Sequence, residues 1–327
     1  MPIARQDMQQ ATVYATLGNP VPDGITVAFL KLRDGKKIRY ALFPASGRPL
    51  KGTVVVLPGR NECIEKYFET MLDLSKRGFG IATFDWIGQG GSDRLIKDPQ
   101  KGYITSFERY VDEFEQFFDN VALPDCRGPF YILAHSTGSL VALLASPKLI
   151  NRVRRMVLCS PLLALTNQPL GHTQIRRVSG LLSWLGLGRL YMSGGARPRE
   201  TMPFIGNKLT SDLDRYRRNS VIYEEHRELA LGGPTMRWVN AACKAMDRVM
   251  EPSFKAKIQI PTLIIAAGND EIVSNAATER FVRGLRSGAL ITIDGAKHEM
   301  LQEQDIYREQ VLAAFDAFVP GSDASLG

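Results

Sequence analysis

The stretch FYILAHSTG, residues 130–138, indicates the fold of this chain because it places a serine directly after a short apolar run. The first five residues are typical of a buried strand, and the apolar residues after Gly138 are typical of a helix. Ser136 would then lie on a sharp strand-to-helix turn, where the residues two positions away must be small. Ala134 and Gly138 meet that condition. We expect Ser136 to be a nucleophile exposed at the edge of a sheet; the competing interpretation is a structural Ser/Gly turn.

Strand and helix patterns alternate on both sides of this turn. Strand patterns cover residues 25–32, 37–43, 52–59, 80–85, 130–134, 154–160, 262–267 and 289–293, and helix patterns cover residues 62–77, 106–121, 139–145, 276–285 and 306–318. The first two strands are joined by Arg33-Asp34-Gly35, which is a hairpin signal. The alternation predicts an α/β fold with a mostly parallel central sheet flanked by helices.

The alternation is interrupted by a long segment that is rich in Arg and Leu and punctuated by Gly and Pro. We therefore expect an α/β core formed by residues 1–161 and 253–327, with a helical cap inserted at residues 162–252. Such a cap is expected over the carboxyl edge of the sheet, where open α/β folds place their sites.

The charge of the chain is concentrated in this insertion. The formal net charge is +7, and residues 162–250 hold 13 Lys/Arg against 7 Asp/Glu. This asymmetry favours a surface that faces anions, such as lipid head groups or an acidic substrate; the alternative is a solvated basic face without a partner. We expect no nucleic-acid partner, because no compact Lys/Arg run or recognition motif accompanies the charge.

Targeting and cofactor signals are absent from the sequence. The first 20 residues have no apolar core of signal-peptide length, and no apolar run approaches the roughly 20 residues of a membrane span. The four cysteines show no CxxC spacing and are interpreted as reduced thiols, although their spacing does not exclude disulfides. We expect a cytoplasmic protein. No cluster of His, Cys and Asp has ligand spacing, so no metal or organic cofactor is expected.

A serine nucleophile needs a base, and the chain has four histidines. His298 follows the last predicted strand, where a base can reach over the sheet edge. His135 neighbours Ser136 in sequence, so its side chain is expected to point away, and His172 and His226 fall in the predicted cap. We therefore expect His298 to be the base.

The acid is expected between the serine and the base, because hydrolases with this kind of turn order the three residues in that way. Asp270 follows the apolar strand at residues 262–267 and would fix the imidazole tautomer of the base. Glu271 competes for this role but is less well placed on the turn. Asp294 lies too near the end of the final strand to orient His298.

Two backbone amides are candidates for an oxyanion hole. Thr137 follows the nucleophile at the start of a helix, and Arg60 follows Gly59 in the loop after the third strand. An ordinary strand-to-helix turn fits the Arg60 loop almost equally well. The glycine-rich residues 85–92 lack both nucleotide-loop spacings, so we interpret them as a tight turn beside the site.

With these motifs assembled, the chain resembles the monoacylglycerol lipase and bacterial lysophospholipase branch of the α/β-hydrolases over about residues 25–318. The motifs are PGRNECIEKY at 58–67, DWIGQGGSD at 85–93, AHSTG at 134–138, AGNDEIV at 267–273 and GAKHEML at 295–301. In the predicted cap, NKLTSD at 207–212 and GGPTMRWV at 232–239 are closer to the bacterial members.

The resemblance implies that Ser136, Asp270 and His298 form the catalytic triad and that the amides of Arg60 and Thr137 form the oxyanion hole. Many relatives have His-Gly where this chain has Pro58-Gly59. Because the donor is a backbone amide, this departure bears on substrate preference rather than on the chemistry.

The sequence therefore predicts a serine hydrolase that cleaves carboxylic esters through an acyl-enzyme, acting on a monoacylglycerol or a lysophospholipid. A thioesterase, an amidase or a peptidase can use the same triad, and a non-catalytic binding protein on this fold is the alternative of another class. Dehalogenases and epoxide hydrolases are disfavoured, because they carry a carboxylate in place of Ser136.

The basic and apolar residues 174–191 suggest a segment that lies against an anionic membrane or lines an acyl pocket. Simple packing of the cap onto the core is the alternative, and three internal glycines argue against one continuous amphipathic helix.

Overall fold

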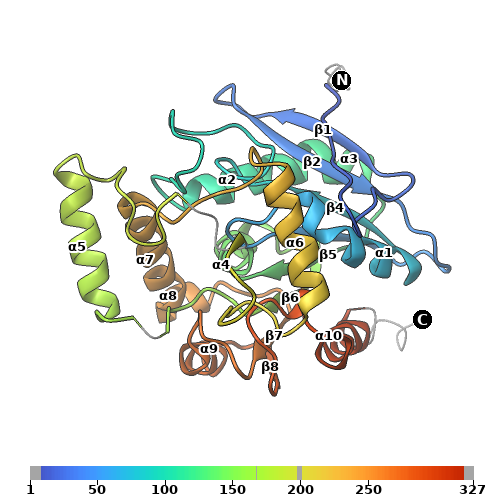
Figure 1. Ribbon diagram of the computed structural model, residues 1–327. Coiled ribbons are helices and arrows are strands. Elements are labelled where there is room, and N and C mark those ends of the chain that lie inside the picture. The colour runs from blue at the N-terminus through green and yellow to red at the C-terminus, as the bar shows by residue number, and fades with distance from the viewer. Residues whose placement is uncertain (1–8, 167, 197–200, 320–327) are drawn as a thin grey trace.

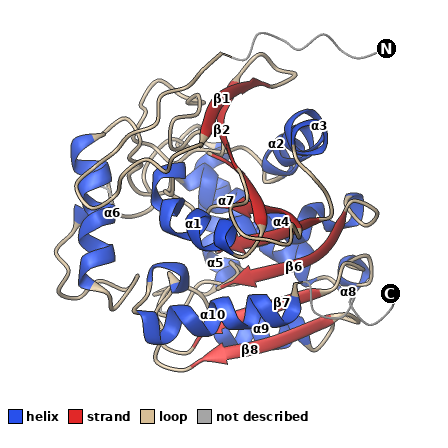
Figure 2. Ribbon diagram, turned by 90° about the vertical axis from the view of Figure 1, so that its right-hand side faces the viewer, coloured by secondary structure: helices blue, strands red, loops and turns tan. Residues whose placement is uncertain are grey.

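The computed structural model describes residues 9–166, 168–196 and 201–319 and has an eight-stranded sheet at its centre. The strands are β1 (Thr26–Lys31), β2 (Lys37–Phe43), β3 (Gly52–Leu57), β4 (Phe79–Phe84), β5 (Phe130–His135), β6 (Val153–Cys159), β7 (Thr262–Ala267) and β8 (Gly288–Ile293). Their order is β1-β2-β4-β3-β5-β6-β7-β8, and Figure 2 shows a twisted layer with β1 and β8 at opposite ends. β1–β2 and β2–β4 pair antiparallel and every other pair is parallel, which confirms the predicted mostly parallel sheet.

Helices cover both faces of the sheet. The helices that flank it are α1 (Phe68–Lys76) and α10 (Asp305–Phe318) on one face, and α2 (Glu108–Phe117), α4 (Thr137–Ala145) and α9 (Asn275–Val282) on the other, with the short α3 (Leu123–Asp125) after α2. In β3, Val54 and Val56 pack toward α1 and α10, whereas Val55 and Leu57 pack toward the opposite face. Because both faces are covered, every residue of this strand is buried, as its mainly apolar sequence indicated.

Two predicted helices differ in detail from the structure. The helix predicted at residues 62–77 begins with a 3₁₀ turn, Ile64–Tyr67, in which the Ile64 N–H donates to Asp85 Oδ1 at 2.9 Å, and α1 follows from Phe68. The helix predicted at residues 106–121 ends as α2 at Phe117 and continues as a π-helical turn, Phe118–Ala122.

Among the residues that the structure describes between β6 and β7, the α-helices are α5 (His172–Trp184), α6 (Leu213–Glu225), α7 (Met236–Met250) and α8 (Pro252–Lys255). Figure 1 shows α5 beside α7 at one edge of the molecule, with α6 across the front. The Asp212 side chain caps α6 by accepting from the Arg215 N–H, and the Thr235 side chain caps α7 in the same way. Within the described residues, no helix is long and apolar enough to cross a membrane.

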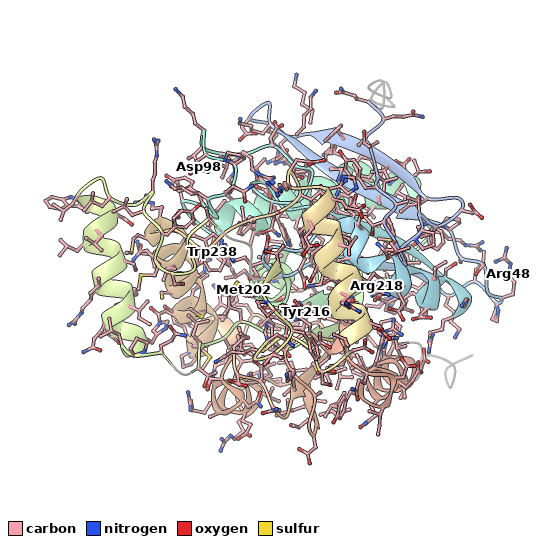
Figure 3. The ribbon with its side chains drawn as sticks, in the orientation of Figure 1. Arg48, Asp98, Met202, Tyr216, Arg218 and Trp238 are labelled. Atoms are coloured by element: carbon pink, nitrogen blue, oxygen red, sulfur yellow. The ribbon has the colours of Figure 1, made fainter. Side chains whose placement is uncertain are left out.

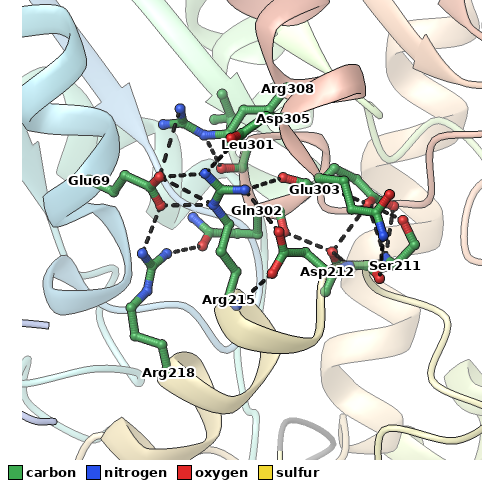
Figure 4. Close-up of polar contacts among 12 residues, drawn as sticks. Glu69, Ser211, Asp212, Arg215, Arg218, Leu301, Gln302, Glu303, Asp305 and Arg308 are labelled. Carbon is green, nitrogen blue, oxygen red and sulfur yellow. Dashed lines mark hydrogen bonds and ion pairs between the residues drawn. The ribbon is translucent and has the colours of Figure 1, made fainter. Parts of the chain in front are cut away.

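A charged cluster fastens α6 to the core, as Figure 4 shows. Glu69 of α1 accepts from Arg215 at 2.6 Å and from Arg218 at 2.7 Å, and Arg215 also donates to Asp305 at 2.7 Å. Burial opposes ionisation of Glu69, but the hydrogen bond from Arg215 and the charge of Arg308 lower its pKa to about 2. Part of the basic excess of this segment is therefore paired with a half-buried carboxylate of α1.

Candidate active site

Ser136 lies on a strained turn between β5 and α4. Its backbone has φ 49° and ψ −109°, a conformation that a residue with a side chain rarely adopts. The turn is tight on the helix side, since a Cβ added to Gly138 would lie 2.3 Å from the Leu57 carbonyl oxygen. The small residue required by the sequence argument is thus explained by contact with β3. The strained turn brings the Ser136 side chain to the carboxyl edge of the sheet.

The structure brings together the three residues predicted as nucleophile, base and acid. Ser136 Oγ lies 3.0 Å from His298 Nε2, and His298 Nδ1 lies 2.8 Å from Asp270 Oδ2. Because an ionised carboxylate only accepts hydrogen bonds, Nδ1 carries the proton and Nε2 accepts from the serine hydroxyl. This is the arrangement in which an imidazole can take a proton from a nucleophile.

Asp270 is held in place by its own backbone turn. Its Oδ1 accepts from the N–H groups of Ile272 at 2.8 Å and Val273 at 2.9 Å, which leaves Oδ2 for His298. Burial by itself raises the pKa of Asp270, but the hydrogen bond and charge of His298, together with the two amides, lower it below its ordinary value. The competing acid Glu271 instead forms an ion pair with Lys208 at 2.9 Å.

A cavity of about 320 Å³ opens at Ser136 and His298. Its lining is mainly apolar, with Leu162, Leu165, Ile175, Met192, Leu209, Pro234, Trp238, Val239, Ala242, Met246 and Ile272. Most of these residues come from the segment between β6 and β7, including α5 and α7. The volume falls at the lower end of the range for small-molecule sites.

Both predicted oxyanion-hole residues, Arg60 and Thr137, line this cavity beside Ser136. Thr137 is the first residue of α4, where the positive end of the helix dipole favours a developing negative charge. The side chain of Arg60 contacts the segment above the sheet, because its Nη2 donates to the Gly232 carbonyl and its guanidinium lies 5.4 Å from the ring of Trp238. Figure 3 shows Trp238 on α7.

A buried polar cluster beside Ser136, part of which lines the cavity, was not predicted from the sequence. Glu62 accepts from Lys66 Nζ at 3.1 Å, and Lys66 Nζ also donates to Glu299 at 2.6 Å. His135 joins this cluster to the loop of His298. Its Nδ1 lies 3.1 Å from Glu62 Oε1, and its Nε2 lies 3.1 Å from the His298 carbonyl oxygen. The expectation that His135 points away from the Ser136 side chain agrees with these contacts. The only sequence signal for the cluster is the i, i+4 spacing of Glu62 and Lys66.

Several known proteins are similar to this chain over most of its length. Residues 48–305 match the family model described as serine aminopeptidase, S33. Lysophospholipase L2 of Escherichia coli is 30% identical over 295 residues, covering 87% of this chain and 84% of that protein. The probable lysophospholipase L2 of Haemophilus influenzae is 31% identical over 283 residues, covering 86% of this chain and 87% of that protein.

Solved structures support the same fold. A soluble variant of monoglyceride lipase from Saccharomyces cerevisiae superposes with a TM-score of 0.72 at 19% identity, covering 91% of this chain and 96% of that chain. The resemblance seen in the sequence motifs is therefore confirmed, and the chain belongs to the serine aminopeptidase S33 family of α/β-hydrolases.

Proposed function

We propose that this protein hydrolyses a carboxylic ester of a single-chain lipid, a lysophospholipid or a monoacylglycerol, through an acyl-enzyme on Ser136. The observation that carries the proposal is the hydrogen-bonded series from Ser136 through His298 to Asp270 at an apolar cavity. The names of the relatives in Escherichia coli and Haemophilus influenzae support the same substrate class.

The proposed reaction has two steps. Ser136 Oγ attacks the ester carbonyl while His298 Nε2 takes its proton, and the amides of Arg60 and Thr137 stabilise the resulting oxyanion. The imidazolium, stabilised by Asp270, then returns the proton to the leaving alcohol as the ester bond breaks. A water molecule, deprotonated by His298, attacks the acyl-enzyme and releases the fatty acid and Ser136.

The cavity favours a lipid ester over the amino terminus of a peptide. Residues 162–252 act in this proposal as a cap whose apolar side chains enclose the acyl chain. Among the described residues, the carboxylates that line the cavity are those of Glu62, Glu271 and Glu299, and each forms an ion pair with a cationic side chain. An aminopeptidase site requires a carboxylate that is available to the ammonium group of its substrate.

The outer surface of α5 supports peripheral contact with an anionic membrane. Ile175 on its inner face lines the cavity, whereas Leu181 is 58% exposed and Trp184 is 80% exposed. Arg177 and Arg189 lie exposed in the same stretch. Apolar side chains flanked by basic residues suit insertion at a lipid interface, close to the cavity that receives the acyl chain.

Vesicle sedimentation tests the membrane contact. Replacing Leu181 and Trp184 together by serine should weaken binding to vesicles that contain phosphatidylglycerol, and higher salt should weaken binding of the native protein. Ile306→Ser, which alters an exposed apolar residue of α10 (68% exposed), is the matched control. Turnover of a short soluble ester should stay the same in both variants. Unchanged vesicle binding of the double variant would refute the contact.

The function itself is tested with a panel of acyl substrates. Labelling of Ser136 by a fluorophosphonate probe, lost in Ser136→Ala, separates a hydrolase from a binding protein on this fold. Lysophospholipids, monoacylglycerols, acyl thioesters and aminoacyl amides of matched acyl chain then compare the substrate classes. We expect the highest kcat/KM for the lipid oxygen esters, and preferential cleavage of aminoacyl amides would overturn the proposal.

A further inference from the structure

We propose that His135, the residue before the nucleophile, is a permanently protonated imidazolium. It positions the loop that carries His298 (the base loop) against the loop of Gly59 and Arg60 (the oxyanion loop). The inference rests on the proposed function, because it assigns His135 as a positioning residue for His298. The evidence is the pair of hydrogen-bond partners that the two ring nitrogens of the buried His135 side chain have.

Both partners of the His135 ring can only accept hydrogen bonds. Nε2 faces the carbonyl oxygen of His298, which has no proton to give. Nδ1 faces Glu62, whose carboxylate already accepts from the Gly59 N–H, from Lys66 Nζ and from the Tyr67 hydroxyl at 2.6 Å. Three donors directed at one carboxylate require it to be ionised. Both nitrogens of His135 must therefore carry protons, because a neutral ring would leave one acceptor facing another.

The balance of charge in the buried cluster also indicates that His135 is protonated. Two carboxylates, Glu62 and Glu299, lie with the single lysine Lys66. An imidazolium at His135 balances the four side chains, whereas a neutral ring would leave one buried negative charge uncompensated.

The surroundings of the ring agree with its charge. Burial by itself lowers the pKa of His135, but the charge and hydrogen bond of Glu62, assisted by Glu299 and opposed by Lys66, raise it. On the neighbouring strand β6, Cys159 is paired with His135 in register, and burial raises the pKa of its thiol to about 12, so it stays neutral.

The position of His135 links two parts of the proposed machinery. Through Glu62 it contacts the loop of Gly59 and Arg60, and through the His298 carbonyl it contacts the base loop. The loop approaches so closely that a Cβ added to Gly59 would lie 2.8 Å from His135 Nδ1 and 2.9 Å from Glu62 Oε2. The His135 ring also lies 4.9 Å from the His298 ring, so its charge acts on the base directly.

The protonation state can be measured on the native protein without any substrate. Two-bond ¹H–¹⁵N spectra of the histidine rings, assigned with single His→Gln variants, report which nitrogens carry protons. We expect His135 to show an imidazolium, with protons on both ring nitrogens, from pH 6 to pH 9. A neutral His135 tautomer at pH 7.5 would overturn the inference and would leave the proposed function untouched.

The positioning role is tested with His135→Gln, which removes the charge. We expect kcat for a short soluble ester to fall by roughly 10²-fold with little change in KM, because the base and the oxyanion loop lose their common anchor. The variant also removes a positive charge 4.9 Å from the His298 ring. The acidic limb of the kcat/KM profile should therefore move to higher pH.

The control is His172→Gln, which replaces a histidine outside the cavity and should leave the profile unchanged. A lowered kcat with an unmoved acidic limb would show that His135 supports the fold only, and would contradict the proposed electrostatic action. If His135→Gln does not fold, the spectra of the native protein still decide whether the imidazolium exists. Absence of Ser136 labelling in the native protein would instead be a failure of the proposed function.

Discussion

Replacing Asp270 by asparagine should reverse the tautomer of the base while leaving the architecture of the site intact. In the native site Oδ1 accepts from two backbone N–H groups and Oδ2 accepts from His298. The asparagine oxygen must take the Oδ1 position, because only an oxygen can accept from two amides. Its NH2 group then faces His298 Nδ1, so Nδ1 becomes the acceptor and the ring proton moves to Nε2. A protonated Nε2 cannot take the proton of Ser136.

The expected loss in kcat for Asp270→Asn is roughly 10,000-fold, the size found when the same tautomer reversal is imposed on a serine protease triad. This corresponds to about 5 kcal/mol in the activation free energy. The assay is steady-state hydrolysis of a short soluble ester, with urea unfolding to check that the variant is folded. Asp294→Asn changes the other aspartate near the base and should stay within about twofold of native activity. A loss below about tenfold in folded Asp270→Asn would show that the base does not depend on Asp270 for its tautomer.

Three further predictions concern the charged cluster around Glu69, the turn at Ser136 and the cavity. Glu69→Gln should lower the free energy of unfolding by about 2 kcal/mol at pH 7, measured in urea, after discounting for partial exposure. The pKa of Glu69 is about 2 in the folded protein, against an ordinary 4.5. Glu69 therefore stabilises the folded state fully above about pH 4.5, and this stabilisation disappears as the pH falls toward 2. A variant that is equally destabilised at pH 3 and pH 7 would contradict this. Gly138→Ala should abolish activity or folding, as judged by circular dichroism and ester hydrolysis, because its Cβ would overlap backbone carbonyls, and a fully active variant would disprove the turn geometry. Ala242→Phe should reduce kcat/KM for long acyl chains more than for short ones, and equal loss across chain lengths would argue against an acyl pocket.

The parts of the molecule that were predictable are those with a local signature. Strand β5 (Phe130–His135) and the turn at Ser136 could be found because apolar runs and small residues report burial and steric limits within a few positions. The position of His298 could be inferred because the carboxyl ends of parallel strands meet at one edge of the sheet.

The parts that were not predictable depend on residues far apart in the chain. Lys66 and Glu299 form an ion pair across 233 positions, and nothing near either residue indicates the partner. The same holds for Glu69 and Arg215, which are 146 positions apart, so an arginine that adds to the basic charge of its segment faces a carboxylate of the core. Sequence charge counts cannot separate such internal pairs from an exposed basic surface.

The acyl-enzyme on Ser136 can be observed directly during turnover. Rapid acid quenching of the native protein during hydrolysis of a long-chain lysophospholipid is followed by mass spectrometry of its peptides. We expect an added acyl group on the peptide of β5 and α4, localised to Ser136 and absent from Ser136→Ala. Turnover that persists in Ser136→Ala, or an acyl group on another residue of the native protein, would contradict it.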